Sequence, residues 1–177
     1  AAREQFFRRY AVNCFVTNDP EGHAPVIVEP LGGYYDVFGR TEYEATLGAF
    51  GTDHLHLRAG ALHRANGGFL VLQAAEALRQ PFVWDRLKEA LRRGRARLAN
   101  LGSQMTLFPT AALEPDEIEL DVKVVLVGPG SVYQLLHALD DDVPGLFKIR
   151  ADFDDQMPRD EEGVRHYARF VSRVAHE

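Results

Sequence analysis

Residues Phe69 to Gln73 read FLVLQ, a short apolar run that ends in a polar side chain. A nucleotide hydrolase places an aspartate at the end of such a buried strand, because the carboxylate helps to hold Mg²⁺ beside the phosphates. Gln73 offers a neutral amide instead, and Glu76 lies about one helical turn further along. The chain also lacks the phosphate-cradling sequence G-x-x-x-x-G-K-[ST]. By themselves these residues favour a core strand with a polar end over a nucleotide-site strand.

Histidines and an aspartate form a second group that could do chemistry. In the sequence DHLHL, His54 and His56 would share one face of a strand, beside Asp53, and could bind a metal ion. No third ligand follows at a matching spacing, so an exposed strand face is the favoured interpretation. His63, within ALHRANGG, is equally suited to bracing a turn and to acting chemically.

Cys14 and Ser131 are weaker candidates for nucleophiles. Cys14 lies in the apolar run VNCFV, predicted to be a strand, and is expected to be a small buried hydrophobic residue. Ser131 begins an apolar-periodic segment, which favours a helix N-cap. Because Cys14 is the single cysteine, the chain has no internal disulfide and no cysteine-based zinc site, which fits a reducing cytoplasm.

The aromatic residues Phe38, Tyr43 and Phe50 lie in a glycine-rich stretch between Leu31 and Gly60 that has no strong periodicity. Such a long irregular segment within a compact domain is usually functional or mobile. Exposed aromatic side chains on it would contact a partner chain, whereas buried ones would pack the segment onto the sheet. The residues alone leave these two alternatives open.

Composition excludes several classes of protein. The 177 residues include 46% hydrophobic and 26% charged residues, and no apolar stretch approaches the roughly 20 residues that a membrane span needs. The net charge of -6 gives no general attraction to nucleic acid, and the basic cluster between Arg86 and Arg97 is expected to be a solvated helix face. Helical patterns at both ends, residues 1–10 and 161–176, suggest an excised fragment of a larger protein.

Strands that alternate with helices predict an open, mainly parallel α/β sheet. The predicted strands span residues 12–16, 25–30, 69–72, 121–128 and 147–153, and the predicted helices span residues 74–78, 81–94, 131–139 and 161–175. The strands at 25–30 and 121–128 are continuously apolar, which is typical of burial on both faces. Residues 96–113 form a plausible hairpin around Leu101 to Gln104.

Four segments, in this order, resemble the AAA+ module of the Lon-related bacterial proteases, close to the LonB-like and LonC branches: VFGRTEYEATLGAF, GALHRANGGFLVLQA, LDVKVVLVG and LFKIRADFD. The resemblance covers essentially the whole chain, and ALHRANGG before a buried strand is its most specific part. It implies a three-layer AAA+ domain with a mainly parallel central sheet, a β-hairpin inserted at residues 97–120 and the start of a helical lid. Residues 1–155 would be a partial AAA+ core without the phosphate loop, and residues 156–177 the beginning of the lid.

The resemblance also implies roles for individual residues. Members of this family are hexameric proteases in which an AAA+ ring passes polypeptide into a chamber of Ser-Lys protease domains, which would lie outside this chain. Gln73 would stand where the family's second nucleotide motif has an aspartate, so the ATP/Mg²⁺ site is expected to be degenerate or absent. Lys148 and Arg150 would lie near the basic finger that reaches a neighbouring subunit's nucleotide. Phe38, Tyr43 and Phe50 would face the axial pore and contact substrate.

The leading hypothesis is therefore an internal AAA+ fragment of a Lon-like protease in the cytoplasm. It would gate or translocate unfolded polypeptide within a homo-oligomeric ring, and it carries no peptidase residues of its own. Losing one magnesium carboxylate removes several kcal/mol of transition-state stabilisation, so ATPase activity is not expected. The alternative is a degenerate AAA+ scaffold or interaction module of a helicase-like or transcription-activator ring. Neither hypothesis involves a membrane or a nucleic acid ligand for this chain.

Overall fold

The computed structural model describes residues 6–8, 10–18, 21–46, 49–98, 115–154 and 156–175, with only the backbone described at residues 44–46 and 49–50. The chain divides into two compact units, residues 1–146 and residues 147–177. The division into domains at residues 155 and 156, expected from the family, stays a prediction.

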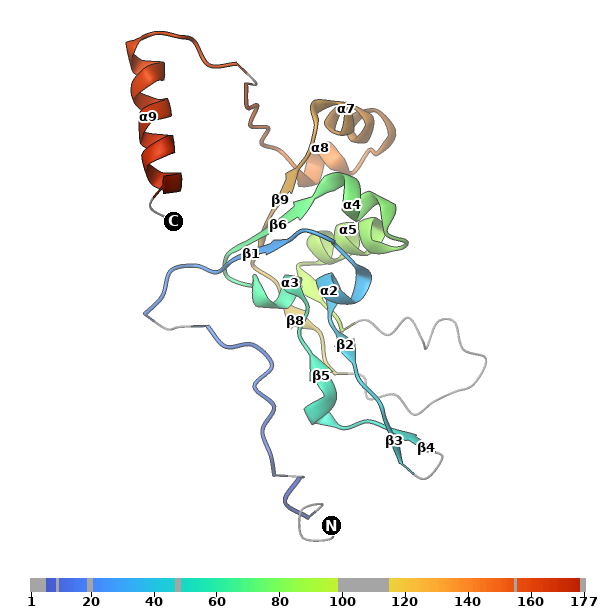
Figure 1. Cartoon of the computed structure of the whole chain (residues 1–177). Helices are drawn as coiled ribbons and strands as arrows, with labels where there is room; N and C mark the ends of the chain where they lie inside the picture. The colour runs from blue at the N-terminus through green and yellow to red at the C-terminus, as the bar shows by residue number, and fades with distance from the viewer. Residues whose placement is uncertain are drawn as a thin grey trace. The chain divides into compact units, whose positions relative to one another are not determined.

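A three-stranded parallel sheet forms the centre of the first unit (Figure 1). Its order is β1 (Val26–Glu29), β6 (Phe69–Gln73) and β9 (Lys123–Val127), so β6 is the middle strand. Val28 pairs with Val71, which in turn pairs with Val125. The predicted parallel α/β architecture is confirmed, and the strands expected at residues 25–30, 69–72 and 121–128 are all present.

One face of this sheet carries the hydrophobic core. Leu70 and Leu72 of β6 are fully buried there, and Ile27, Val124 and Leu126 pack beside them from the outer strands. Four helices supply most of the rest of this core: α2 (Tyr34–Phe38), α3 (Ala61–Arg64), α4 (Ala74–Arg79) and α5 (Val83–Arg93). Period-two alternation along the strands places all of these sheet residues on the same side.

The opposite face of the sheet is apolar but exposed. Val26 and Val28 of β1, and Val125 and Val127 of β9, are each more than 40% exposed. The sequence predicted burial on both faces, because parallel strands normally lie between two helical layers. The described residues supply one of those two layers.

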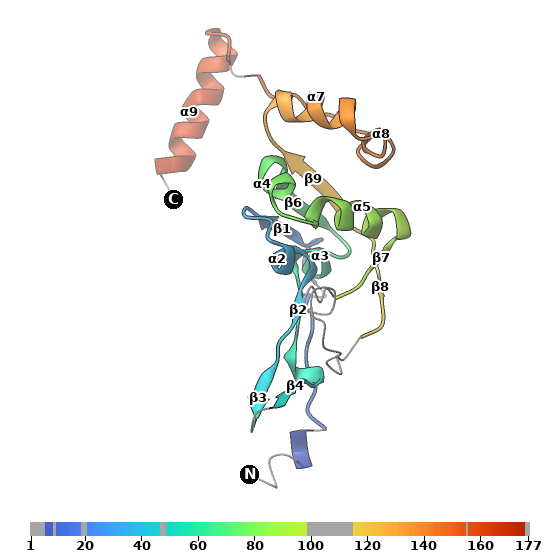
Figure 2. The same ribbon diagram turned by 90° about the vertical axis from the view of Figure 1, so that its right-hand side faces the viewer.

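An antiparallel ribbon occupies most of the segment between α2 and α3. Strand β2 (Arg40–Thr41) pairs with β5 (Leu57–Arg58), and β3 (Glu44–Thr46) pairs with β4 (Ala49–Gly51). A short 3₁₀ helix, η1 (His54–His56), precedes β5. Figure 2 shows β2 leading away from α2 toward the β3 and β4 pair. The prediction of an irregular segment over residues 31–60 was wrong, because short strands of two or three residues carry too few side chains to show a period.

A second antiparallel pair lies at the base of the predicted inserted hairpin. Strand β7 (Arg95–Ala96) pairs with β8 (Ile118–Glu119). The hairpin turn predicted at Leu101 to Gln104 falls within residues 99–114, which lie outside the described residues.

Beyond β9 the first unit ends in two helices, α7 (Gly130–Leu139) and α8 (Val143–Leu146). Lys88 of α5 binds the carboxylates of Asp140 (2.8 Å) and Asp142 (3.2 Å) in the turn between these helices. Trp84 also donates its indole N–H to Asp140, at 2.7 Å. Hydrogen bonding from Lys88, more than the opposing effect of burial, holds the pKa of Asp140 below its ordinary value. The second unit contains α9 (Glu161–Ala175), which confirms the predicted C-terminal helix.

Several local predictions were wrong. Residues 12–16 and 147–153 form no strand, because an apolar alternation becomes a strand only where another strand offers its backbone. Cys14 is consequently exposed and not buried. The N-cap of α7 is Pro129, so Ser131 lies inside the first turn of that helix.

The sequence Asn66-Gly67-Gly68 joins the starts of all three sheet strands. Phe69 N–H donates to the carbonyl of Pro25, and Lys123 N–H donates to the carbonyl of Gly68. Asn66 uses its side chain on the same segment: Nδ2 donates to the carbonyl of Glu119 (2.9 Å), and Oδ1 accepts from the amide of Asp121 (2.7 Å). Gly67 has a φ of +81°, which a side chain would disfavour.

We predict that Gly68→Ala destabilises the fold by about 2–4 kcal/mol, because a Cβ at this position would overlap the carbonyl oxygen and ring of Pro25. Urea unfolding followed by circular dichroism measures the change. Gly130→Ala is the matched control, since a Cβ there meets open space. Equal stability of the two variants would contradict this account of the junction.

Candidate functional site

The C-terminal edge of the parallel sheet is where ligands bind in open α/β folds. Gln73 ends β6 at this edge, next to Val127 of β9, and it is exposed. It occupies the N-cap position of α4, but its side chain makes no capping hydrogen bond. The amide of Gln73 is therefore placed at the edge of the sheet as the sequence predicted.

Glu29 is a carboxylate at the same edge that the sequence analysis did not single out. It ends β1, where it pairs with Leu72, and its side chain is only 15% exposed. Arg64 Nη2 lies 3.8 Å from its Oε2 atom. The sequence VIVEP contained a signal for this residue, because a charged residue ends an otherwise apolar strand there.

These residues do not fit a magnesium and nucleotide site. Mg²⁺ is usually held by carboxylates together with substrate phosphates, whereas Gln73 is neutral and Glu29 is already paired with Arg64. Among the described residues, no group of three or more His, Cys, Asp or Glu side chains converges to hold a metal ion.

Lys148 and Arg150 lie in the second unit, in extended chain without regular secondary structure. Lys148 is exposed. Arg150 Nε donates to Asp152 Oδ1 at 2.8 Å within the same unit. Their assignment to a nucleotide-contacting finger stays a prediction.

Tyr43 and Phe50 both lie on the ribbon. Tyr43 connects β2 to β3 and is half-buried. Phe50 lies in β4 opposite Ala45, and its side chain is outside the described atoms. The ribbon therefore places both backbones on one antiparallel structure that extends from the core.

Glu42 fastens the two strands at the base of this ribbon. Its carboxylate accepts hydrogen bonds from Arg40 Nη2 (2.9 Å) and Arg58 Nε (2.9 Å), and Thr52 Oγ1 donates to its backbone carbonyl (2.8 Å). The hydrogen bonds from Arg40 and Arg58 hold the pKa of Glu42 below its ordinary value. Because the pairs are exposed, their individual contributions to stability are small.

Phe38 does not belong with the other two aromatic residues. It lies in α2 with 1% of its surface exposed, and its ring packs against Tyr34 at a centroid distance of 5.2 Å. A side chain buried this deeply is a core residue and contacts no passing polypeptide. Its expected role in substrate contact was therefore wrong. A five-residue helix is too short to show an apolar period in the sequence, so the helix around Phe38 was not predicted.

His54 and His56 lie in the 3₁₀ helix η1 and not on a strand. His56 Nδ1–H donates to Asp53 Oδ1 at 2.7 Å, and Asp53 also accepts from the amide of Leu55. Burial raises the pKa of Asp53, but these hydrogen bonds, together with the nearby charges of His56 and Arg8, hold it below its ordinary value. The expectation of an exposed strand face was wrong about the backbone, since Asp53 caps a 3₁₀ turn.

His63 is the buried polar residue of the core and is 2% exposed. In the part of the chain that the structure describes, neither of its ring nitrogens has a hydrogen-bond partner. Burial lowers the pKa of His63 from 6.5 to about 4. The neutral imidazole is therefore part of the core, and whether it braces the turn or acts chemically stays a prediction.

Comparison with known proteins agrees with this fold and with the ALHRANGG junction. Residues 22–154 match the family described as "LonB-like, AAA domain". The chain belongs to this family. It is also 28% identical over 120 residues to a protein named "Putative Lon protease homolog" from Escherichia coli (strain K12). That alignment covers 67% of this chain and 20% of the relative, so the chain spans about a fifth of that protein's length.

Family membership confirms the Lon-related AAA+ assignment made from the sequence at the level of the domain. Among the described residues, no helix has the length and apolar character needed to cross a bilayer.

The buried His63 predicts a pH dependence of stability. The pKa of His63 is lower in the folded chain than in the unfolded chain. Its contribution to the free energy of unfolding is therefore fully present above about pH 6.5. As the pH falls toward 4 the protein loses at most about 3 kcal/mol of this free energy. The free energy of unfolding of His63→Leu should fall less between pH 6.5 and pH 4 than that of the unmodified chain. At pH 7 the variant should be at least as stable, because leucine leaves no buried polar atom unpaired.

Urea unfolding across this pH range tests the expectation. His23→Ala is the control, since His23 is exposed. A His63→Leu profile parallel to that of the unmodified chain would contradict it.

Proposed function

We propose that this chain is the part of a Lon-like protease subunit that handles unfolded polypeptide. Within the full-length subunit it gates or translocates substrate toward a serine protease chamber. The proposal is carried by the ribbon, an antiparallel element extending from an AAA+ core and bearing Tyr43 and Phe50. Family membership supports the class of assembly.

The ribbon has the physical features of an element that contacts a moving chain. Its base is held by the backbone pairing of β2 with β5, across which Glu42 bonds to Arg40 and Arg58, while its outer part consists of only two three-residue strands. Aromatic rings provide a large contact area that does not depend on substrate sequence. A fixed base with an aromatic outer part suits non-specific contact with polypeptide.

We further propose that the nucleotide site of this subunit is degenerate. Gln73 replaces the carboxylate of the family's second nucleotide motif, and Glu29 at the same edge is paired with Arg64. The ring would then handle polypeptide without ATP turnover, as in the LonC branch. Lys148 and Arg150 would lie near the basic finger that reaches the neighbouring subunit's nucleotide. A homo-oligomeric hexamer in the cytoplasm completes the proposal.

The runner-up function is a degenerate AAA+ scaffold in a helicase-like or transcription-activator ring. The antiparallel pair β7 and β8 at the base of an inserted segment favours it, because those rings share such an insertion. Sequence on either side of this chain separates the two functions, since a Ser-Lys protease domain fits only the first.

Tyr43→Ala and Phe50→Ala in the full-length protein are expected to slow degradation of an unfolded protein such as casein by about tenfold, because each removes about 1–2 kcal/mol of aromatic contact. Cleavage of a small fluorogenic peptide should be unchanged, because it needs no translocation. Tyr35→Ala, on α2 outside the ribbon, is the control. Undiminished casein degradation by both ribbon variants would exclude the substrate-contact role.

The full-length protein is expected to show no Mg²⁺-dependent ATP hydrolysis above background, because Gln73 cannot replace a magnesium carboxylate. A coupled phosphate-release assay with and without EDTA measures this. Robust turnover that disappears in Gln73→Ala would prove the degenerate site wrong.

A further inference from the structure

An extended N-terminal segment lies along the base of the ribbon. We name it the strap and define it as Arg8 together with residues 10–15. It precedes β1, yet its contacts are with residues 53–57, more than 40 positions later in the chain. No backbone ladder joins the two segments, so side chains carry the attachment.

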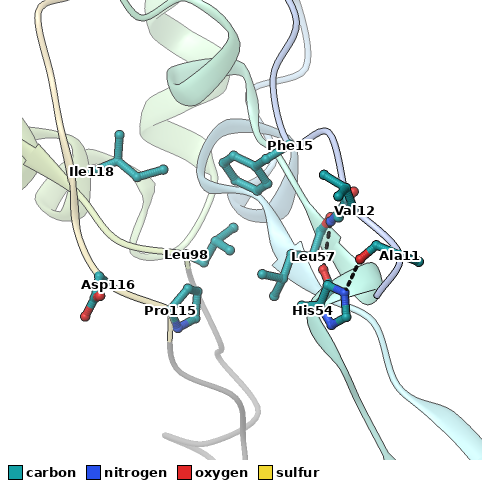
Figure 3. Close-up of a pocket in the computed structure, with 10 residues that line it drawn as sticks. Ala11, Val12, Phe15, His54, Leu57, Leu98, Pro115, Asp116 and Ile118 are labelled. Carbon is teal, nitrogen blue, oxygen red and sulfur yellow. Dashed lines mark hydrogen bonds between the residues drawn. The ribbon is translucent and has the colours of Figure 1, made fainter. Parts of the chain in front are cut away.

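Asn13 is the centre of this attachment. Its Nδ2 group donates one hydrogen bond to the carbonyl of His54 (2.9 Å) and another to the carbonyl of Leu57 (3.0 Å). His54 returns a bond, because its Nε2–H donates to the carbonyl of Ala11 at 2.7 Å (Figure 3). The side-chain amide of Asn13 thus donates to two carbonyls where η1 passes into β5, and the imidazole of His54 donates in return to the backbone of the strap.

Arg8 extends the attachment to the start of η1. Its Nε atom lies 3.1 Å from Asp53 Oδ2, and its Nη2 group donates to His56 Nε2 at 3.3 Å. His56 in turn donates Nδ1–H to Asp53. The guanidinium, the carboxylate and one neutral imidazole tautomer are therefore mutually consistent donors and acceptors.

The other end of the strap reaches the core. The ring of Phe15 meets the ring of His63 edge-on, with centroids 5.2 Å apart. His63 belongs to α3, which leads through the Asn66-Gly67-Gly68 junction into β6 and Gln73. The strap also lines a pocket of about 450 Å³ with Leu57, Leu98 and Ile118 (Figure 3). One short segment thus contacts both the ribbon base and the helix before the nucleotide-motif strand.

We propose that the strap is a positioning device that holds the ribbon base against α3 through its contacts with residues 53–57 and with His63. Polar contacts to carbonyls at a ribbon base can be released and remade without unfolding the core, whereas an apolar interface could not. The effect on polypeptide handling rests on the proposed function, but the mechanical attachment does not.

Hydrogen–deuterium exchange on the full-length protein tests the attachment. Asn13→Ala should raise the exchange rates of amides in β2, η1 and β5 by about tenfold, because two hydrogen bonds to the ribbon base are lost. Amides of β6 and β9 should keep their rates. His54→Ala, which leaves both acceptors of Asn13 in place, should give a smaller increase of about threefold. Asn18→Ala, beyond the strap in the same extended segment, is the control.

Unchanged ribbon exchange in Asn13→Ala would overturn the proposal, and so would an equal increase in β6 and β9, which would indicate general destabilisation. If the ribbon is selectively loosened, casein degradation by Asn13→Ala should fall while small-peptide cleavage is retained. Selective loosening together with normal casein degradation by Tyr43→Ala and Phe50→Ala would support the strap and reject the proposed function of the ribbon.

Discussion

The structure depends on the close backbone contact at Gly68. There the carbonyl of Pro25 accepts the amide of Phe69, and the carbonyl of Gly68 accepts the amide of Lys123. These two hydrogen bonds set the register of β1 on β6 and of β6 on β9 at a single point. Any side chain at Gly68 would separate the strands, so the glycine fixes the geometry of the sheet.

Register at this junction decides what lies at the other end of the sheet. With Phe69 opposite both Val26 and Lys123, the strands end with Glu29, Gln73 and Val127 at one edge. That edge presents one paired carboxylate, one amide and one valine, a poor set of ligands for a hard cation. The composition of the candidate nucleotide site therefore follows from strand register together with strand length.

A second close contact between backbones lies where the ribbon leaves the core. Gly39 has a φ of +72°, and a Cβ on Gly60 would overlap its amide nitrogen. This contact lets β2 and β5 leave the core side by side, after which Glu42 and the strap hold them. Core and ribbon are thus joined by glycine contacts and polar contacts, while apolar packing is concentrated in the helices against β6.

Elements with a clear apolar pattern were predictable, including the short β1 and α4, whereas the two- and three-residue strands of the ribbon were not. The strands 69–73 and 123–127 and the helices 83–93 and 161–175 carry enough residues for a period to appear, and each was expected at nearly its observed bounds. The segments at 12–16 and 147–153 had the same local pattern but found no strand to pair with. Glu29 was missed because its place at the ligand-binding edge depends on the pairing of β1 with β6, which sequence order does not reveal.

The sequence by itself determined the α/β class, the family and the neutral side chain at the end of β6, because these depend on local composition and on a contiguous motif. Only the tertiary structure decided that Phe38 is core, that the ring nitrogens of His63 are buried with no hydrogen-bond partner among the described residues, and that Asn13 binds the ribbon. Those outcomes arise from contacts between residues more than twenty positions apart. Burial and hydrogen-bond satisfaction are set by such distant partners, so local patterns could not specify them.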